Sequence, residues 1–126
     1  MKKIFVIDDE YAMAKLLKLE LESRGYTVEF ALSCNEAFEK LDKFFPELIT
    51  LDIMMPEMNG FQVFELLTKD ERYNKIPVVF VSVISTDINK KRAMEMGAVD
   101  AIPKPINFDK LIKIIEQCKD GFVRLK

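Results

Sequence analysis

The chain has 126 residues, 49% of them hydrophobic and 32% charged, a composition typical of one globular domain with one core. Its net charge of −2 gives no electrostatic basis for nonspecific binding to nucleic acid or an anionic membrane, and no apolar run reaches the roughly 18 residues of a membrane span. The sequence contains no histidine, which excludes histidine zinc sites and catalysis by a histidine base.

The first residues, MKKIFVIDDE, predict a strand over 3–7 rather than a secretory signal, because the apolar run soon meets two aspartates. This strand is apolar on both faces, as expected of a central parallel strand. A helix is predicted over 11–24, ended by Gly25. Its buried face is predicted to consist of Met13, Leu16, Leu17 and Leu21. The next strand, 27–31, alternates apolar and polar residues and is expected nearer an edge of the sheet.

The middle of the chain continues the alternation of strands and helices. A capping box of Ser33 and Glu36 predicts the start of the second helix, which runs to residue 44 or 45. The strand ELITL, 47–51, follows and leads directly to Asp52. The remaining predicted elements are a helix over 61–69 that buries Phe61, Phe64 and Leu67, a strand over 77–83, a helix over 86–96, a strand over 98–102 and a helix from Asn107 to about Gly121.

Strands and helices that alternate with short connections indicate an α/β fold, a doubly wound parallel sheet of five strands with helices on both faces. We expect one domain over residues 1–120, with 121–126 as a tail or the start of a linker. The two cysteines, Cys34 and Cys118, have no paired spacing. We expect both to be reduced thiols in a cytoplasmic protein rather than a disulfide or a metal site.

Polar side chains follow the carboxyl ends of four predicted strands. They are Asp8 and Asp9 after the first strand, Asp52 after the third, Ser82 in the fourth and Lys104 after the fifth. In open parallel sheets, ligands bind beyond these ends, at the point where the strand order reverses. If the first and third strands are neighbours, their three aspartates converge at one edge of the sheet.

Three crowded carboxylates repel one another, and burial makes the repulsion worse. Mg²⁺ prefers oxygen ligands and relieves this repulsion, while Lys104 adds a second positive charge and Ser82 adds a hydroxyl donor. A metal, an ammonium and a hydroxyl around one carboxylate are the groups that stabilise a phosphoryl group during transfer. The residues therefore predict that Asp52 is a nucleophile that forms an acyl phosphate.

Each of these residues taken alone has an ordinary structural explanation. Asp8 and Asp9 favour the N-terminus of the following helix, and Asp52 is a common turn residue. Ser82 suits any strand, and most lysines, Lys104 included, are solvated. Only the occurrence of all of them in order, at successive strand ends, indicates a functional site.

In that order the motifs resemble the receiver domain of bacterial two-component response regulators, the chemotaxis-regulator fold. The motifs are an acidic pair after the first strand, the lone aspartate of LDIMMPEMNG, a serine after the fourth strand and Lys-Pro after the fifth. The resemblance covers essentially the whole chain. It implies a flavodoxin-like three-layer sandwich with strand order 2-1-3-4-5. It also implies that Asp52 accepts a phosphoryl group from a phosphohistidine of a sensor histidine kinase or phosphotransfer protein.

The same resemblance implies roles for individual residues. Lys104 would pair with one phosphoryl oxygen, Ser82 would hydrogen-bond another, and the Lys104–Pro105 peptide bond would be cis. Phosphorylation would switch an output surface that acts on a partner or effector not identified by the sequence. The domain would catalyse only its own phosphorylation and dephosphorylation. The implied Mg²⁺ ligands are the carboxylates of Asp9 and Asp52, the backbone carbonyl of Met54 and, through water, Asp8.

Three features depart from the family pattern. Ala101 stands where an aromatic residue usually takes part in the switch, so we expect a different output coupling. Val83 stands where a small residue usually leaves room for the phosphoryl group. Met54 and Ile84 are bulky residues near the path of the attacking water, so we predict slow self-dephosphorylation.

Several alternatives remain open from the sequence. The chain is either a stand-alone regulator or a fragment of a longer regulator or hybrid kinase, and a homodimer that depends on phosphorylation fits either. A Mg²⁺-dependent aspartyl phosphatase of the haloacid dehalogenase type also uses an aspartate nucleophile. That class needs a second aspartate where this chain has Met54. A flavin carrier shares the fold but has a phosphate-binding loop where this chain has DDE.

Overall fold

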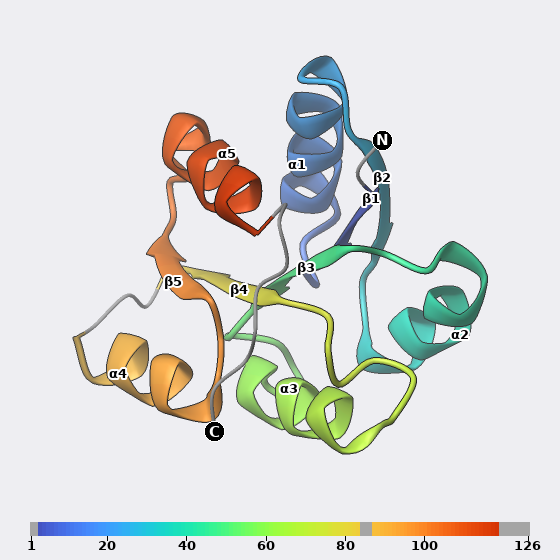
Figure 1. Cartoon of the computed structure of the whole chain (residues 1–126), viewed down its shortest axis with the longest axis vertical. Coiled ribbons are helices and arrows are strands. Elements are labelled where there is room, and N and C mark those ends of the chain that lie inside the picture. Colours follow the sequence, from blue (N-terminus) through green and yellow to red (C-terminus); the bar gives the residue numbers. More distant parts are fainter. Residues whose placement is uncertain (1–2, 84–86, 119–126) are drawn as a thin grey trace.

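A computed structural model describes residues 3–83 and 87–118 of the chain. Five strands form one parallel sheet in the order β2-β1-β3-β4-β5, which confirms the predicted topology (Figure 1). The strands are β1 Lys3–Ile7, β2 Thr27–Ala31, β3 Leu48–Asp52, β4 Val78–Ser82 and β5 Asp100–Pro103. The helices are α1 Tyr11–Ser23, α2 Cys34–Phe44, α3 Gly60–Lys69, α4 Asp87–Met96 and α5 Phe108–Gln117.

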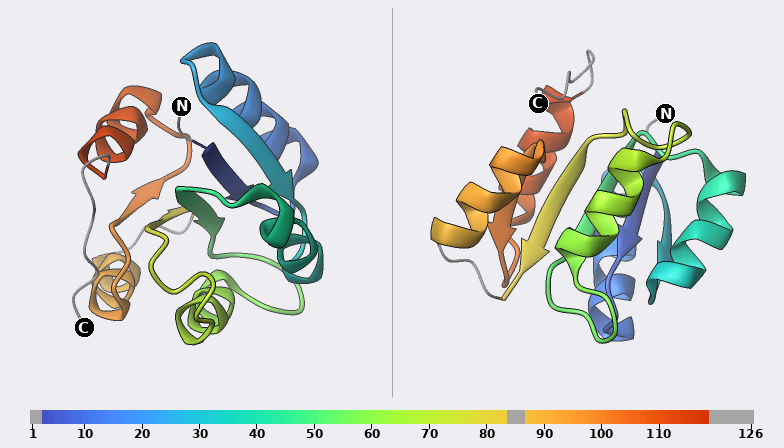
Figure 2. Two further views of the ribbon diagram at one scale, coloured as in Figure 1. Left: turned by 45° about the vertical axis from the view of Figure 1, so that its right-hand side comes forward. Right: turned by 90° about the horizontal axis from the view of Figure 1, so that it is seen from below.

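The helices cover both faces of the sheet. α1 and α5 lie on one face, and α2, α3 and α4 lie on the other (Figures 1 and 2). Each face has its own hydrophobic cluster, one with side chains from α1 and α5 and one with side chains from α2, α3 and α4. Every residue of β3 and β4 is buried, as expected of strands covered by helices on both faces.

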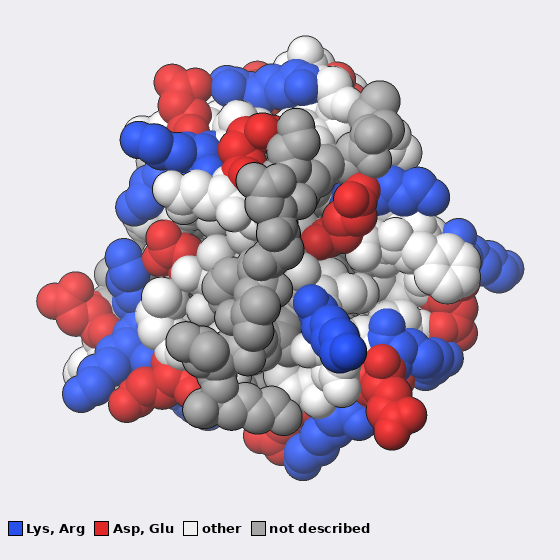
Figure 3. All heavy atoms as spheres, in the orientation of Figure 1, with Lys and Arg blue, Asp and Glu red and all other residues white. Residues whose placement is uncertain are grey.

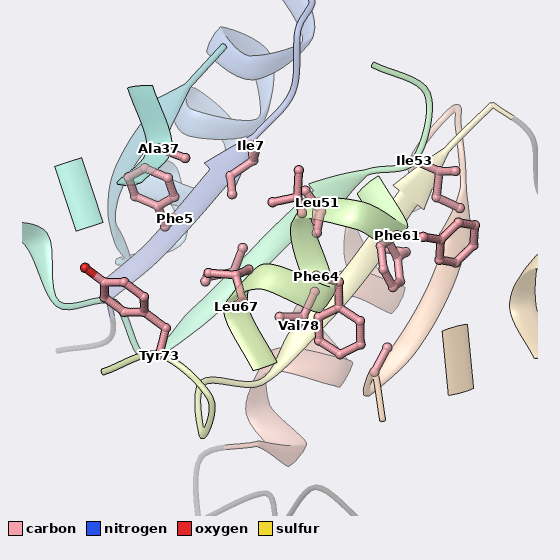
Figure 4. Close-up of a cluster of buried hydrophobic side chains, with 14 of the residues drawn as sticks. Phe5, Ile7, Ala37, Leu51, Ile53, Phe61, Phe64, Leu67, Tyr73 and Val78 are labelled. Carbon is pink, nitrogen blue, oxygen red and sulfur yellow. The ribbon is translucent and has the colours of Figure 1, made fainter. Parts of the chain in front are cut away.

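The cluster beneath α3 fixes the position of that helix on the sheet. Phe80 of β4 packs against Phe61 and Phe64 of α3, with ring centroids 5.1 and 5.4 Å apart. Figure 4 shows this cluster extending from Tyr73 at one end to Ile53 at the other. Burial of each phenylalanine stabilises the fold by about 1.5–3 kcal/mol. This packing holds α3, and with it the end of the loop that comes from β3, against the sheet.

Lysines from the flanking helices cover the outer edge of β2. Lys18 of α1 donates a hydrogen bond to the Val28 carbonyl at 2.7 Å, and Lys40 of α2 donates one to the Phe30 carbonyl at 2.8 Å. The Phe30 backbone N–H donates to the carboxylate of Glu29 at 2.9 Å. These groups of the edge strand are therefore paired within the chain rather than open to another strand.

Two predictions about helices are wrong. Leu16 is 45% exposed, and Ala14 takes the buried position beside Leu17 and Leu21. The capping box at Ser33 is only half formed, because the Glu36 carboxylate accepts a hydrogen bond from Leu32 N–H and not from that of Ser33. Asn59 and Gln62 form a complete box at the start of α3 instead.

The fifth strand begins two residues later than the predicted range of 98–102. Gly97 adopts a left-handed conformation with φ 103°, and Ala98 N–H donates to the Ala93 carbonyl at 3.0 Å, so this residue completes the end of α4. The predicted start of α4 at Thr86 and the predicted end of α5 near Gly121 lie outside the described residues. So does the predicted domain boundary at residue 120.

The surface carries both signs of charge, and Figure 3 shows acidic and basic side chains interspersed over the visible face. None of the described helices is long and apolar enough to cross a membrane. Cys34 is half-buried, Cys118 is buried, and neither forms a disulfide bond.

Candidate functional site

The three aspartates of the sequence prediction lie together at the carboxyl edge of the sheet. β1 and β3 are parallel neighbours with Ile7 opposite Leu51, so the residues that follow them emerge side by side. Asp8 and Asp52 are buried, with 2% and 4% of their surface exposed. Asp8, Asp9 and Asp52 each offer one carboxylate oxygen within 4.8 Å of the others.

Lys104 reaches into this acidic group from the loop that follows β5. Its side chain is only 4% exposed, and its Nζ lies 2.8 Å from Asp8 Oδ2 and 3.4 Å from Asp52 Oδ2. Its backbone N–H donates to the Ser82 carbonyl at 2.9 Å, which fixes the start of the loop to the end of β4. The Lys104–Pro105 peptide bond is cis, as the resemblance implied.

The electrostatics of the site show an excess of negative charge. Burial raises the pKa of the Asp52 carboxyl, and Asp8 raises it further, although Lys104 and the Met54 N–H act in the opposite direction. Burial alone would lower the pKa of Lys104, but its hydrogen bond to Asp8 and the neighbouring carboxylates raise it above its usual value. One ammonium thus faces two buried carboxylates, with a third carboxylate, Asp9, beside them.

The loop from Asp52 to α3 is tight because Gly60 contacts the backbone of Asp52 and Ile53. Gly60 N–H donates to the Ile53 carbonyl at 2.8 Å, and a Cβ at Gly60 would collide with the Asp52 carbonyl oxygen. The Met54 N–H donates to Asp52 Oδ1 at 3.2 Å and orients that carboxylate. The Asn-Gly pair is therefore needed for close approach of the helix to Asp52, with Asn59 as its cap.

Comparison with known proteins assigns the family. A sequence profile of the response regulator receiver domain matches residues 4–116. The chain belongs to this family. The transcriptional regulatory protein CpxR homolog of Haemophilus influenzae is 35% identical over 116 residues, which are 92% of this chain and 49% of that protein. The receiver domain therefore spans about half the length of the curated relatives it matches.

Solved receiver domains share the fold over almost the whole chain. One is the signal receiver domain of a DNA-binding response regulator from Colwellia psychrerythraea, with a TM-score of 0.87 and 28% identity over 96% of this chain and all of that one. Another is the receiver domain of a signal transduction histidine kinase from Syntrophus aciditrophicus, with a TM-score of 0.84 and 30% identity over 100% of this chain and 96% of that one.

Ser82 and Ala101 lie beside a narrow cavity between the sheet and α4 of the receiver domain. The cavity has a volume of about 10 Å³, which is room for no more than one water molecule. Ser82 is 2% exposed and is the last residue of β4. The residue before it, Val81, lies opposite Asp52 of β3. Because residue 101 is alanine, no aromatic side chain from that position shares this space, and the expected change in output coupling stays a prediction.

Two residues predicted to affect access lie at the surface of the receiver domain. Met54 is 53% exposed and Val83 is 66% exposed. Ile84 lies outside the described residues. The predicted effects of these three on phosphoryl access and decay stay predictions.

Sequence reasoning missed one member of the charged group. Glu10 Oε1 lies 3.9 Å from Lys104 Nζ, and the Glu10 N–H donates to Asp8 Oδ1 at 2.9 Å. The run DDE contained the signal, because the N–H two residues after an aspartate commonly bonds to its carboxylate. Glu10 is 67% exposed, so it adds negative charge at the rim rather than inside the site.

Proposed function

We propose that this receiver domain accepts a phosphoryl group on Asp52 from a phosphohistidine of a sensor histidine kinase or phosphotransfer protein. The observation that carries the proposal is a nearly buried carboxylate held 3.4 Å from a nearly buried ammonium at the carboxyl edge of the sheet. The chain contains no histidine, so the donor histidine belongs to another protein or to another part of a longer one.

The donor set fits Mg²⁺, because three carboxylate oxygens converge and the buried ones face a single ammonium. Asp9 and Asp52 would hold the ion directly, Asp8 through water, and the Met54 carbonyl would complete the protein ligands. When bound, Mg²⁺ supplies positive charge that offsets the carboxylates and the oxygens of an incoming phosphoryl group.

The residues of the domain account for the transfer step. An Asp52 carboxylate oxygen attacks phosphorus, a P–O bond forms, and the P–N bond to the donor imidazole breaks with its electron pair leaving on nitrogen. Lys104 pairs with a phosphoryl oxygen as charge moves toward Asp52. The Ser82 hydroxyl donates to a second oxygen, which couples the acyl phosphate to β4 and α4.

The transferred group would act as a switch and not as a step in turnover of another substrate. Phosphorylation replaces the single negative charge of the Asp52 carboxylate with a phosphoryl group of charge about −2, and it biases a two-state surface toward an output partner. The position two residues after Asp52 is Met54, which has no acid to support a phosphatase reaction. We also place the domain in the cytoplasm, either alone or within a longer regulator or hybrid kinase.

Phosphorylation by a small donor tests the proposal. The chain is incubated with phosphoramidate and Mg²⁺, and intact mass and peptide mapping locate the modification. We expect one phosphoryl group on Asp52, none in Asp52→Asn, and unchanged uptake in Asp42→Asn, which alters a carboxylate at the other end of the sheet. Lys104→Ala should still take up phosphate but lose the structural response. Equal modification of Asp52→Asn and the wild type would refute the assignment.

A further inference from the structure

Phe45 is an aromatic residue in an unfavourable position. It ends α2 in the left-handed conformation, with φ 53° and ψ 64°, where glycine or asparagine is favoured. Its side chain is nevertheless 70% exposed to water. Both the backbone conformation and the exposure of the ring are unfavourable in an isolated domain, and a contact outside the domain would explain why an aromatic side chain stands there.

A cleft lies directly beside Phe45. Its volume is about 190 Å³, and a cavity of about 150 Å³ is large enough to hold benzene. The cleft can therefore accept one aromatic side chain. We call the residues that line it the amino-end patch, and they are Asp42, Phe45, Pro46, Arg72, Tyr73 and Ile76.

Hydrogen bonds hold the walls of this cleft in place. The Arg72 guanidinium donates to Asp42 and to Asp70, each at 2.8 Å, and lies over the Tyr73 ring at 4.8 Å. The Tyr73 hydroxyl donates to Asp42. A cleft formed in advance loses little freedom on binding, and exposed arginine with aromatic side chains is typical of the centres of protein interfaces.

We propose that the amino-end patch binds a second copy of this chain. An exposed ring and a cleft large enough to hold it on one patch suit a two-fold interface, since the Phe45 ring of each copy can enter the cleft of the other. The charges around the patch are also balanced. The two segments that form the patch, 42–47 and 69–76, carry four cations and four anions, namely Lys43, Lys69, Arg72 and Lys75 against Asp42, Glu47, Asp70 and Glu71.

This balance of charge favours a second copy over a strongly acidic or basic partner. A patch with no net charge neither repels its own copy nor attracts a polyanion or polycation. The patch also lies at the amino ends of β3 and β4, whereas Asp52 lies at the carboxyl end of β3. The dimer therefore leaves both phosphorylation sites open, and it forms without phosphorylation.

Sedimentation velocity of the whole chain over a range of concentrations tests this proposal. We expect a concentration-dependent dimer whose dissociation constant rises about tenfold or more in Phe45→Gly. Glycine suits the left-handed backbone, so this variant should fold with an unchanged or raised melting temperature. Phe45→Asn serves as a second variant. Leu19→Ala, which removes a side chain that is 53% exposed on α1, is the matched control and should dimerise like the wild type.

The dimer should persist equally with and without beryllium fluoride as a phosphoryl mimic. Three outcomes would overturn the proposal. They are a monomeric wild type at every concentration, equal association of wild type and Phe45→Gly, and association that appears only with the mimic. The last result would place the contact on a surface controlled by Asp52.

Discussion

The two ends of the sheet carry similar charges in opposite surroundings. At the carboxyl end, the Lys104 ammonium lies 2.8 Å from Asp8, and its side chain is 4% exposed. At the amino end, the Arg72 guanidinium lies 2.8 Å from Asp42, but its side chain is 58% exposed. The two ion pairs have equal lengths, so their different consequences come from burial and from the number of carboxylates present.

At the amino end, water solvates the charges, and Arg72 has enough donors for both Asp42 and Asp70. Arg72 accordingly lowers the pKa of Asp70. At the carboxyl end, burial raises the pKa of Asp52, and the single ammonium leaves negative charge uncompensated. A buried site with uncompensated charge is prepared to bind a cation or to react, whereas the exposed one mainly shapes a surface.

Removal of the buried cation should have the largest effect on stability. Lys104→Met leaves Asp8 and Asp52 without their ammonium, so we expect the free energy of unfolding without Mg²⁺ to fall by about 3 kcal/mol. Urea unfolding measures this loss, and added Mg²⁺ should restore part of it. Arg72→Met is the matched change at the amino end and should cost much less. Equal losses at both ends would contradict the role given to burial.

A methyl group at Gly60 should have the next largest effect. Gly60→Ala pushes a Cβ against the Asp52 carbonyl, so we expect a loss of about 2 kcal/mol and slower phosphorylation by phosphoramidate. Gly25→Ala is the control, because φ is 97° there but no atom lies within 4 Å of the new Cβ. That variant should lose stability and keep its phosphorylation rate. Normal phosphorylation of Gly60→Ala would show that the loop does not depend on this contact.

Removal of the Asp52 charge should raise the free energy of unfolding when Mg²⁺ is absent. The gain should be smaller than the losses expected for Lys104→Met and Gly60→Ala. The pKa of folded Asp52 is raised, so the unfolded chain releases this proton first as pH rises. The free energy of unfolding therefore falls between the ordinary carboxyl pKa of about 4 and the raised value in the fold. Asp52→Asn should remove that decline in thermal unfolding from acid to neutral pH. A decline of equal size in the variant would assign it to other carboxylates.

The smallest effect concerns a buried hydroxyl between the two ends. Among the described residues, Thr50 Oγ1 is one of the buried side-chain atoms without a hydrogen-bond partner, and Thr50 is 1% exposed. Thr50→Val should raise the free energy of unfolding by about 0.5–1 kcal/mol, measured in urea. Phosphorylation of Asp52 should be unchanged. A loss of stability would show that the hydroxyl has a partner, such as bound water.

The sequence allowed prediction of the carboxyl end better than the amino end. Residues after successive parallel strands must emerge at one edge, so Asp8, Asp52 and Lys104 could be grouped from strand periodicity and the family resemblance. The amino-end contacts could not be predicted in this way. Asp42 and Arg72 are 30 residues apart in segments that read as a helix surface and a polar loop, and no periodicity relates them.

Three local contacts were not predicted correctly, and each has a physical reason. Leu16 and Ala14 both fit an amphipathic helix, and only the seating of α1 on the sheet decides which is buried. Glu36 had the spacing for a reciprocal capping box with Ser33, but its carboxylate accepts a hydrogen bond from the Leu32 N–H instead. Glu10 was missed because the run DDE indicates the hydrogen bond from the Glu10 N–H to Asp8 but not how close the Glu10 carboxylate comes to Lys104.

The covered edge of β2 affects how many copies can assemble. With Lys18 and Lys40 on the outward carbonyls of Val28 and Phe30, an incoming chain would first have to displace two ammonium groups before it could extend the sheet. Assembly is thereby directed to side-chain contacts of finite size. An edge strand whose outward groups are already paired is a poor template for the continuous strand pairing that builds fibrils.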